Sequence, residues 1–293
     1  MSYFLTLILS VAVLALLLLA VLHLGFRTPR NREQTTPADR GITYEAVSIP
    51  TVAGKRLAGW LLPVTEGDSS LIILHGWGGN AELMLPMALP FHRAGINVLL
   101  FDARNHGESD GDTFSSLPRF AEDLDHAITW LRRQHPQRCR HLALLGHSVG
   151  AGAALLCASR TPDLDAVISI SAFAHPEGMM RRYLQRLHLP GPLLNLVLRY
   201  VQWVIGHRFN DIAPLHTVCQ IQCPILLVHG TADTTVPVED ARVIAQGCPG
   251  ATLQLIEIPQ AAHDSVERIE QHGHELVRFL IRHGFNGQLD RPA

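Results

Sequence analysis

Residues 142–159 read LALLGHSVGAGAALLCAS, and this stretch decides the fold. An apolar run at 142–145 precedes Gly146-His147-Ser148-Val149-Gly150, and mostly small residues follow from 151 to 159. The apolar run is typical of a buried strand, and the small residues are typical of a closely packed helix. A serine on a sharp turn between them has its hydroxyl pushed out of the sheet, and the flanking glycines let helix and strand approach closely. The stretch therefore predicts a strand, a turn that carries a nucleophile, and a helix.

Outside this stretch, short apolar runs alternate with amphipathic helical patterns. We expect eight strands, at residues 43–49, 57–62, 71–74, 97–101, 142–145, 166–170, 225–228 and 253–258. Most of these runs are apolar on both faces, which is typical of parallel strands covered by helices on both sides. The turn at 53–55 makes the first two strands antiparallel. The sequence thus predicts the α/β class, with a mostly parallel sheet of about eight strands flanked by helices.

The alternation is interrupted between residues 172 and 222. This interval contains two helical patterns, at 177–187 and 193–205, divided by Pro190-Gly191-Pro192. We expect a helical insertion that caps the sheet. The second pattern is too apolar for a fully solvated lid, so it either packs over the sheet, or covers an apolar site, or touches a membrane.

Several blocks together resemble the α/β-hydrolase superfamily, and the resemblance covers residues 43–283. In that family a nucleophile is followed by an acid after a later strand and then by a histidine. Ser148 matches the nucleophile, Asp233 in ILLVHGTAD (225–233) matches the acid, and His263 in QAAHD (260–264) matches the histidine. The resemblance implies a Ser-His-Asp triad, in which His263 removes the serine proton and Asp233 orients the imidazole. Asp264 is the alternative acid, but a residue adjacent to the histidine rarely folds back onto its ring.

The same resemblance implies where the negative charge of a tetrahedral intermediate is stabilised. His75-Gly76-Trp77-Gly78-Gly79-Asn80 is similar to the family's His-Gly loop, so the backbone N–H groups of Trp77 and Val149 are expected to form the oxyanion hole. Residues 101–109, FDARNHGES, are similar to the family's D-x-R-G-H-G-x-S segment, with Asn105 in place of glycine, and they support the fold rather than the mechanism. The substrate-pocket candidates are Trp77, His147, Tyr200 and Trp203.

The first 26 residues contain no Asp, Glu, Lys or Arg. As a helix, the 21 residues from Phe4 to Leu24 would reach about 31 Å, the thickness of a bilayer's hydrocarbon core. We predict an uncleaved transmembrane anchor at residues 1–26, because no basic n-region and no Ala-x-Ala cleavage site is present. A linker at 27–41, an α/β-hydrolase domain at 42–285 with its cap insertion at 172–222, and a tail at 286–293 complete the predicted organisation.

Four arginines follow the apolar segment, whereas no basic residue precedes it. The positive-inside rule therefore places the domain in the cytoplasm, on a single-pass protein of a bacterial inner membrane, with a periplasmic location as the alternative. The five cysteines form an odd set without small-scaffold spacing, which favours a reducing compartment. The arginines are Arg27, Arg30, Arg32 and Arg40.

Composition excludes several function classes. With 24 Lys plus Arg against 26 Asp plus Glu, the chain has no positive excess for binding nucleic acid. Lys55 is the single lysine, which excludes phosphate-loop and Schiff-base chemistry. No dinucleotide-binding glycine fingerprint occurs either. Cys219-x3-Cys223 has no second ligand pair at finger spacing, so we expect neither a metal nor a cofactor.

These observations lead to three functional hypotheses. The first is a membrane-anchored serine hydrolase that cleaves carboxylic esters of a small-molecule or lipid-like acyl substrate through an acyl-enzyme. The second is a serine aminopeptidase or an acyl-peptide or thioester hydrolase. The third is a catalytically idle hydrolase fold that serves as a scaffold, although an intact triad argues against it. The serine in the nucleophile position disfavours haloalkane dehalogenase and epoxide hydrolase chemistry, because those relatives of the family carry an aspartate there.

Overall fold

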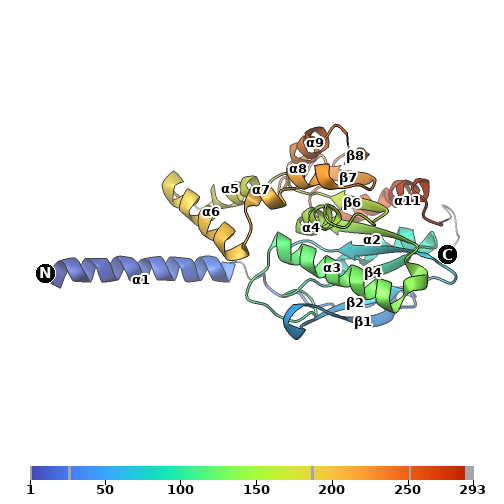
Figure 1. Ribbon diagram of the computed structural model, residues 1–293, viewed down its shortest axis with the longest axis horizontal. Helices are drawn as coiled ribbons and strands as arrows, with labels where there is room; N and C mark the ends of the chain where they lie inside the picture. Colours follow the sequence, from blue (N-terminus) through green and yellow to red (C-terminus); the bar gives the residue numbers. More distant parts are fainter. Residues whose placement is uncertain (1, 26–27, 186–187, 251, 288–293) are drawn as a thin grey trace.

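The computed structural model describes residues 2–25, 28–185, 188–250 and 252–287. Within them, eight strands form one sheet in the order β1-β2-β4-β3-β5-β6-β7-β8. The first two strands are antiparallel to their neighbours, and the other six run parallel, as the sequence predicts (Figure 1). The strands are β1 Glu45–Pro50, β2 Arg56–Leu62, β3 Ser69–Leu74, β4 Asn97–Phe101, β5 His141–His147, β6 Ala166–Ile170, β7 Ile225–Gly230 and β8 Leu253–Ile258.

Helices cover both faces of this sheet. One face packs against α3 Leu117–Gln134, α4 Val149–Ala158 and α9 Val238–Gly247. The opposite face packs against α2 Ala81–Arg93, α10 Val266–Gln271 and α11 Gly273–Arg282. The α3 helix begins where the Ser116 side chain accepts a hydrogen bond from the Arg119 amide, which satisfies one of the free donors of the first turn.

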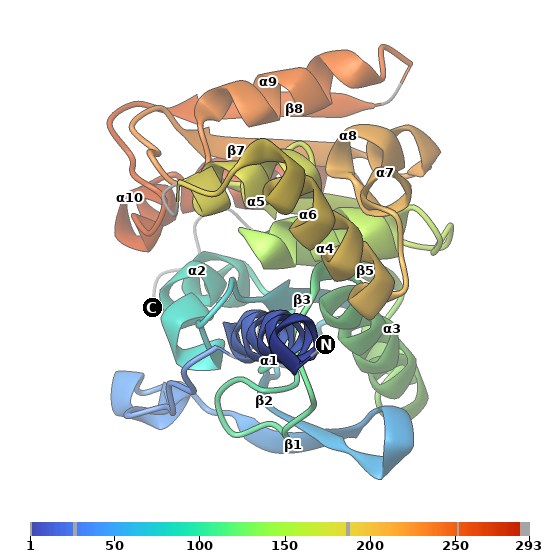
Figure 2. The same ribbon diagram turned by 90° about the vertical axis from the view of Figure 1, so that its left-hand side faces the viewer.

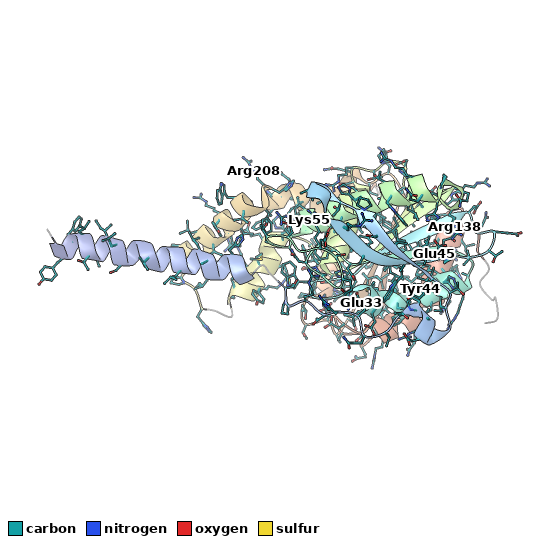
Figure 3. The ribbon with its side chains drawn as sticks, turned by 90° about the horizontal axis from the view of Figure 1, so that it is seen from below. Glu33, Tyr44, Glu45, Lys55, Arg138 and Arg208 are labelled. Atoms are coloured by element: carbon teal, nitrogen blue, oxygen red, sulfur yellow. The ribbon has the colours of Figure 1, made fainter. Side chains whose placement is uncertain are left out.

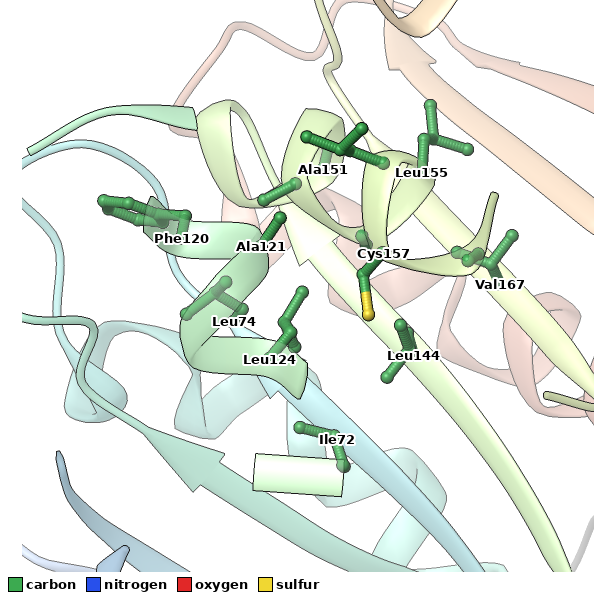
Figure 4. Packing of buried hydrophobic residues seen from close by; sticks show 14 of the residues in the cluster. Ile72, Leu74, Phe120, Ala121, Leu124, Leu144, Ala151, Leu155, Cys157 and Val167 are labelled. Atoms are coloured by element: carbon green, nitrogen blue, oxygen red, sulfur yellow. The ribbon is translucent and has the colours of Figure 1, made fainter. Parts of the chain in front are cut away.

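The central strands are apolar because each has two buried faces. In β3, Ile72 and Leu74 belong to the core under α3 and α4, whereas Leu71 and Ile73 belong to the core under α2 and α11. Successive side chains of a strand point to opposite faces, so a strand covered on both sides needs an unbroken apolar run. Figure 4 shows the first of these cores, with Leu144 of β5 beneath the two helices.

The described residues of the insertion between β6 and β7 form four α-helices at the carboxyl end of the parallel strands. They are α5 Pro176–Gln185, α6 Gly191–Ile205, α7 Phe209–Ile212 and α8 Pro214–Thr217. The α5 and α6 helices and Phe209 share a small core of their own, made of Leu184, Leu194, Val197, Leu198, Val201 and Phe209. Figure 2 shows α5 and α6 across the same end of the molecule as α1, the helix at Ser2–Gly25.

The α1 helix projects away from the domain, with the N-terminus at its far end (Figure 1). Among the residues that the structure describes, no helix is both long enough and apolar enough to cross a membrane. The transmembrane anchor inferred from the sequence therefore stays a prediction.

The segment after α1, predicted as a linker at 27–41, lies against the domain from residue 28 onward. Thr28 is buried, and its hydroxyl is hydrogen-bonded to His106 at 3.1 Å. The Arg30 guanidinium donates to the backbone oxygens of Gly107 and Ser109. Residues 27 and 288–293, which belong to the predicted linker and tail, lie outside the described residues.

Candidate active site

The turn that carries Ser148 has the shape that the sequence predicts. Ser148 has a φ of 55° and a ψ of −119°, a strained conformation for a residue with a side chain. The turn depends on its glycines: a Cβ at Gly146 would lie 2.1 Å from the Gly150 oxygen, and one at Gly150 would lie 2.4 Å from the His75 oxygen. The Ser148 amide donates to the Ile170 oxygen at 2.8 Å, which fixes the turn to β6. Strain and close packing together hold the serine hydroxyl above the sheet.

Three loops at the same edge of the sheet bring Ser148, His263 and Asp233 together. The Ser148 Oγ lies 2.9 Å from His263 Nε2, and His263 Nδ1 lies 2.7 Å from an Asp233 carboxylate oxygen. Because a carboxylate only accepts, Nδ1 carries the proton and donates to Asp233. Nε2 is then free to accept from the Ser148 hydroxyl. This tautomer is the one that a general base for serine requires.

The second Asp233 oxygen is held by backbone. It accepts hydrogen bonds from the amides of Thr235 and Val236, at 2.9 and 2.8 Å. Burial raises the pKa of Asp233, but hydrogen bonds from His229, His263 and the Val236 amide outweigh burial and hold this pKa well below its usual range. Asp233 is therefore ionised wherever the protein is folded at neutral pH, and it can stabilise a charged His263.

Two further buried histidines support the triad. His147 donates from Nε2 to the backbone oxygen of His263 at 2.9 Å. His229 donates from Nε2 to the Val236 oxygen at 2.8 Å, and the same nitrogen lies 3.4 Å from Asp233. Burial, and then the nearby charge of His263, lower the pKa of His147. The lowered pKa keeps His147 neutral, with one ring proton. That proton lies on Nε2 and forms the hydrogen bond to the loop of His263.

The expected oxyanion loop lies beside Ser148. A Cβ at Gly76 would lie 3.0 Å from the Ser148 Cβ, so glycine is what allows this approach. The Ala103 amide donates to His75 Nε2, and His75 Nδ1 donates to the Gly76 oxygen at 2.7 Å. Since C=O and N–H point in opposite directions across a trans peptide, this bond directs the Trp77 N–H away from the His75 ring. Val149 begins α4, so its N–H has no partner within the helix.

A cavity of about 2000 Å³ opens over the serine. Its base contains Ser148, His147 and His263, and its walls come from α2, from the insertion and from the segment after α1. The apolar side chains that line it include Met84, Leu83, Met179, Met180, Val197, Val201 and Ile205. The cavity therefore offers a long apolar wall next to the polar reaction centre.

Two of the four predicted pocket residues line this cavity and two do not. Trp77 and His147 line it, whereas Tyr200 and Trp203 are not among the lining residues. The side chains of α6 that face the cavity are Val197, Val201 and Ile205 instead. Trp203 is 78% exposed, and its ring lies 6.0 Å from the ring of Tyr200. Among the described residues, α6 therefore lines this cavity through its aliphatic face, and a role of Tyr200 and Trp203 in substrate binding stays a prediction.

The described residues offer one cluster of three possible metal ligands, His147, His263 and Asp264, whose ligand atoms lie within 4.8 Å of one another. Both ring nitrogens of His263 already bond to Ser148 and Asp233. A metal there would have to replace at least one of these contacts. The cluster therefore does not fit a resident metal that coexists with an intact triad.

The sequence did not indicate that the segment after α1 contributes to the site. The Asn31 side chain donates to the Gly78 oxygen at 2.8 Å, and the Asn80 side chain donates to the Asn31 oxygen at 3.2 Å. Glu82 at the start of α2 accepts from the Gln34 amide at 2.6 Å. These contacts hold the expected oxyanion loop from its outer side.

Comparisons with known proteins agree with this geometry. The model of the family described as serine aminopeptidase, S33, matches residues 65–219. An esterase of Pyrococcus furiosus has the same fold, with a TM-score of 0.71 and 26% identity over 88% of this chain and 97% of the esterase. An uncharacterized membrane protein of Saccharomyces cerevisiae is 29% identical over 254 residues, 85% of this chain and 84% of that protein.

A thiohydrolase of Aspergillus aculeatus is 33% identical over 131 residues, 44% of this chain and 41% of that enzyme. The family model covers more than half of the chain, including the turn of Ser148. The chain therefore belongs to the serine aminopeptidase S33 family, within the α/β-hydrolase superfamily.

Proposed function

We propose that this protein is a serine hydrolase that cleaves carboxylic esters, with Ser148 as nucleophile, His263 as base and Asp233 as the acid of the triad. One observation carries the proposal: the unbroken hydrogen-bond chain from the Ser148 hydroxyl through His263 to Asp233, with links of 2.9 and 2.7 Å. A scaffold would have no need to keep a strained serine in this chain.

In the first half of the reaction, the Ser148 oxygen attacks the acyl carbon while its proton passes to His263 Nε2. The imidazolium that forms is stabilised by ionised Asp233. The amides of Trp77 and Val149 donate to the negative oxygen of the tetrahedral intermediate, and removing one such donor typically costs about 10² to 10³ in turnover. His263 then protonates the leaving alcohol, and the acyl group stays on Ser148.

In the second half, a water molecule takes the place of the alcohol. His263 removes a proton from the water, which attacks the acyl carbon, and the carboxylic acid leaves as Ser148 regains its proton. The same three residues thus act twice, and no metal or cofactor is needed.

The cavity supports a lipid-like acyl substrate over a peptide. Its apolar wall suits a hydrocarbon chain, whereas an aminopeptidase needs carboxylates to bind the substrate's ammonium group. Among the described residues that line the cavity, the carboxylates are Glu82 and Asp264, and Glu82 already accepts from the backbone of Gln34. The arginines outnumber them, which disfavours a cationic substrate; they are Arg30, Arg32, Arg40, Arg182 and Arg268.

We also propose that α1 attaches the domain to a membrane. The helix leaves the domain on the side of the cavity, since Gly25 at its end lines that cavity. Large apolar side chains near its start are exposed, such as Tyr3, Phe4 and Leu7. The membrane protein of yeast provides a parallel over most of its length. Attachment at this end would bring lipid-like substrates to the cavity mouth.

We propose that the domain lies on the cytoplasmic side of the membrane, as the positive-inside rule predicts. Arg30 and Arg32 also have partners in the domain, since Arg30 donates to two backbone oxygens and Arg32 lies 3.5 Å from Glu108. Their positions therefore have a structural reason besides orientation. A reporter fused to the C-terminus decides: activity on the periplasmic side would overturn the cytoplasmic location.

The experiment is fluorophosphonate labelling of the full-length protein in detergent, followed by a panel of nitrophenyl acyl esters. We expect the wild type to label and to hydrolyse esters, and Ser148→Ala to lose both activities. Thr235→Ala, a loop neighbour whose backbone amide rather than its side chain binds Asp233, is the matched control and is expected to label normally. Equal labelling of wild type and Ser148→Ala would reject the nucleophile.

Two other substrates separate the alternatives. Hydrolysis of acyl thioesters in preference to the matching oxygen esters would assign the site to thioester chemistry, which the thiohydrolase relative makes the second candidate. Hydrolysis of aminoacyl amides but not esters would assign it to peptidase chemistry. If wild type is folded by circular dichroism but is not labelled, both hydrolase hypotheses are rejected and the scaffold hypothesis is favoured.

A further inference from the structure

Two cysteines that are far apart in the sequence meet on the surface of the domain. Cys219 lies in the short helix η4 Val218–Gln220, at the end of the insertion, and Cys248 directly follows α9. The Cys219 thiol donates to the backbone oxygen of Gly247, the residue directly before Cys248, at 3.5 Å, so the two thiols lie side by side. Cys219 is exposed and Cys248 is half-buried, so reagents in solution can reach the pair.

The other three cysteines have different surroundings. Cys157 is buried and donates to a carboxylate oxygen of Asp125 at 3.1 Å. Cys139 donates to the His135 oxygen at 3.4 Å, and Cys223 is buried. Cys157 and Cys223 are therefore shielded from reagents in solution, whereas Cys219 is exposed.

We propose that Cys219 and Cys248 form an intramolecular disulfide when the protein meets a thiol-oxidising environment. The bond would fasten the end of the insertion to the end of α9. It does not depend on the proposed ester chemistry.

The position of α9 explains why such a bond matters. Asp240 of α9 accepts hydrogen bonds from the Ala174 amide, at 3.1 Å, and from Arg182 of α5, at 2.6 Å. These contacts hold the start of the insertion. A disulfide at the other end of α9 would hold its last helical turn as well. Because α9 directly follows the loop of Asp233, both ends of the cap would then be fixed relative to the triad.

The chemistry balances with a small-molecule disulfide as the oxidant. The Cys219 thiolate attacks a sulfur of that disulfide and expels one small thiol. The Cys248 thiolate then attacks the Cys219 sulfur, which releases the second small thiol and forms the protein disulfide. Two electrons pass from the cysteines to the oxidant. The hydrogen bond with Cys248, followed by burial, raises the pKa of Cys219 to about 11, so the exchange becomes faster as the pH rises above neutral.

The test uses the full-length protein in detergent, incubated at pH 8 with oxidised glutathione, then denatured, alkylated and counted by mass. We expect wild type to keep three alkylatable thiols and to yield a crosslinked peptide that contains positions 219 and 248. The bond closes a loop whose ends lie 29 positions apart, so the Tm should rise by about 5–10 °C and fall again with dithiothreitol.

Three variants make the result specific. Cys219→Ser and Cys248→Ser should each keep four alkylatable thiols and show no rise in Tm. Cys139→Ser, the control, should keep two and retain the rise. The proposal is overturned if five thiols remain in wild type, if glutathione stays attached to Cys219, or if the crosslink joins Cys223 instead.

Discussion

His147 donates a hydrogen bond to the backbone oxygen of His263 across 2.9 Å, and the two rings lie 5.1 Å apart. The residue that precedes the nucleophile thus supports the loop that carries the base. This contact joins the end of β5 to the loop that follows β8. The distance from base to serine depends on it, because His263 otherwise sits on a loop between β8 and α10.

We expect His147→Ala to lower kcat by about tenfold to hundredfold while KM changes little, because a displaced base loses transition-state stabilisation only. His147→Gln can donate from its amide and should recover part of the loss. Steady-state kinetics with a soluble nitrophenyl ester measure both. An equal kcat for His147→Ala and wild type would show that the hydrogen bond has no positioning role.

The sheet could be predicted because a strand buried on both faces has an unbroken apolar run in the sequence. Strands such as β4 and β7 are apolar at nearly every position, and this run is visible without any knowledge of partners. The start of β3 was missed by two residues, since Ser69 and Ser70 are polar but buried. Ser70 donates to the Arg138 oxygen at 2.8 Å, and a hydrophobicity pattern cannot predict such a contact.

The face of α6 that lines the cavity was not predicted, for a different reason. The chemistry of Tyr200 and Trp203 suits an interface, whereas the buried stripe of the helix is Leu194, Val197, Leu198 and Val201. That stripe has the spacing of one helical face and could have been read from the sequence. The segment at 28–34 could not, because its contacts join single polar groups up to 79 positions apart.

Gly76 allows the expected oxyanion loop to touch the nucleophile. In Gly76→Ala, the new methyl group would lie 3.0 Å from the Ser148 Cβ and 3.1 Å from His147, so the loop must shift by a few tenths of an ångström. We expect kcat to fall by about tenfold or more, because oxyanion donors act only at short range. Gly178→Ala on α5, where the nearest atom is 3.9 Å away, is the control and should keep full activity. Urea unfolding of both variants distinguishes a lost fold from a moved loop.

Arg104 forms ion pairs with three acidic side chains, Asp112, Glu122 and Asp123. Its side chain is 3% exposed, and Nε donates to Asp123 at 2.7 Å. Breaking a buried ion pair from one side leaves an unpaired charge, so Arg104→Ala should cost about 3–5 kcal/mol of unfolding free energy. Arg242→Ala removes an exposed pair with Glu257 and should leave the urea midpoint nearly unchanged. Similar midpoints for the two variants would contradict the structural role of Arg104.

Glu33 (Figure 3) places a buried carboxyl group beside Asp102. Burial raises the pKa of Asp102 to about 8, and the charge of the neighbouring Glu33 contributes to the rise. The folded protein therefore keeps a proton that the unfolded chain releases, so stability falls as the pH rises from the unfolded pKa to the raised one. Glu33→Gln removes the second charge, and its Tm should fall less between pH 5 and pH 9. The exposed Glu45→Gln is the control and should follow wild type; identical slopes for all three proteins would exclude the effect.

The last prediction concerns the two faces of the insertion. Met180 lines the cavity from α5, whereas Trp203 is exposed on α6 and is not among the lining residues. A larger side chain at position 180 takes up space that an acyl chain would fill. Each excluded methylene costs about 1–3 kcal/mol in an apolar pocket, so Met180→Trp should lower kcat/KM for a long-chain ester at least tenfold relative to a short one. Trp203→Ala should leave this ratio unchanged with soluble substrates. If Trp203→Ala shifts chain-length preference and Met180→Trp does not, the acyl chain lies on the outer face of α6 rather than in the cavity.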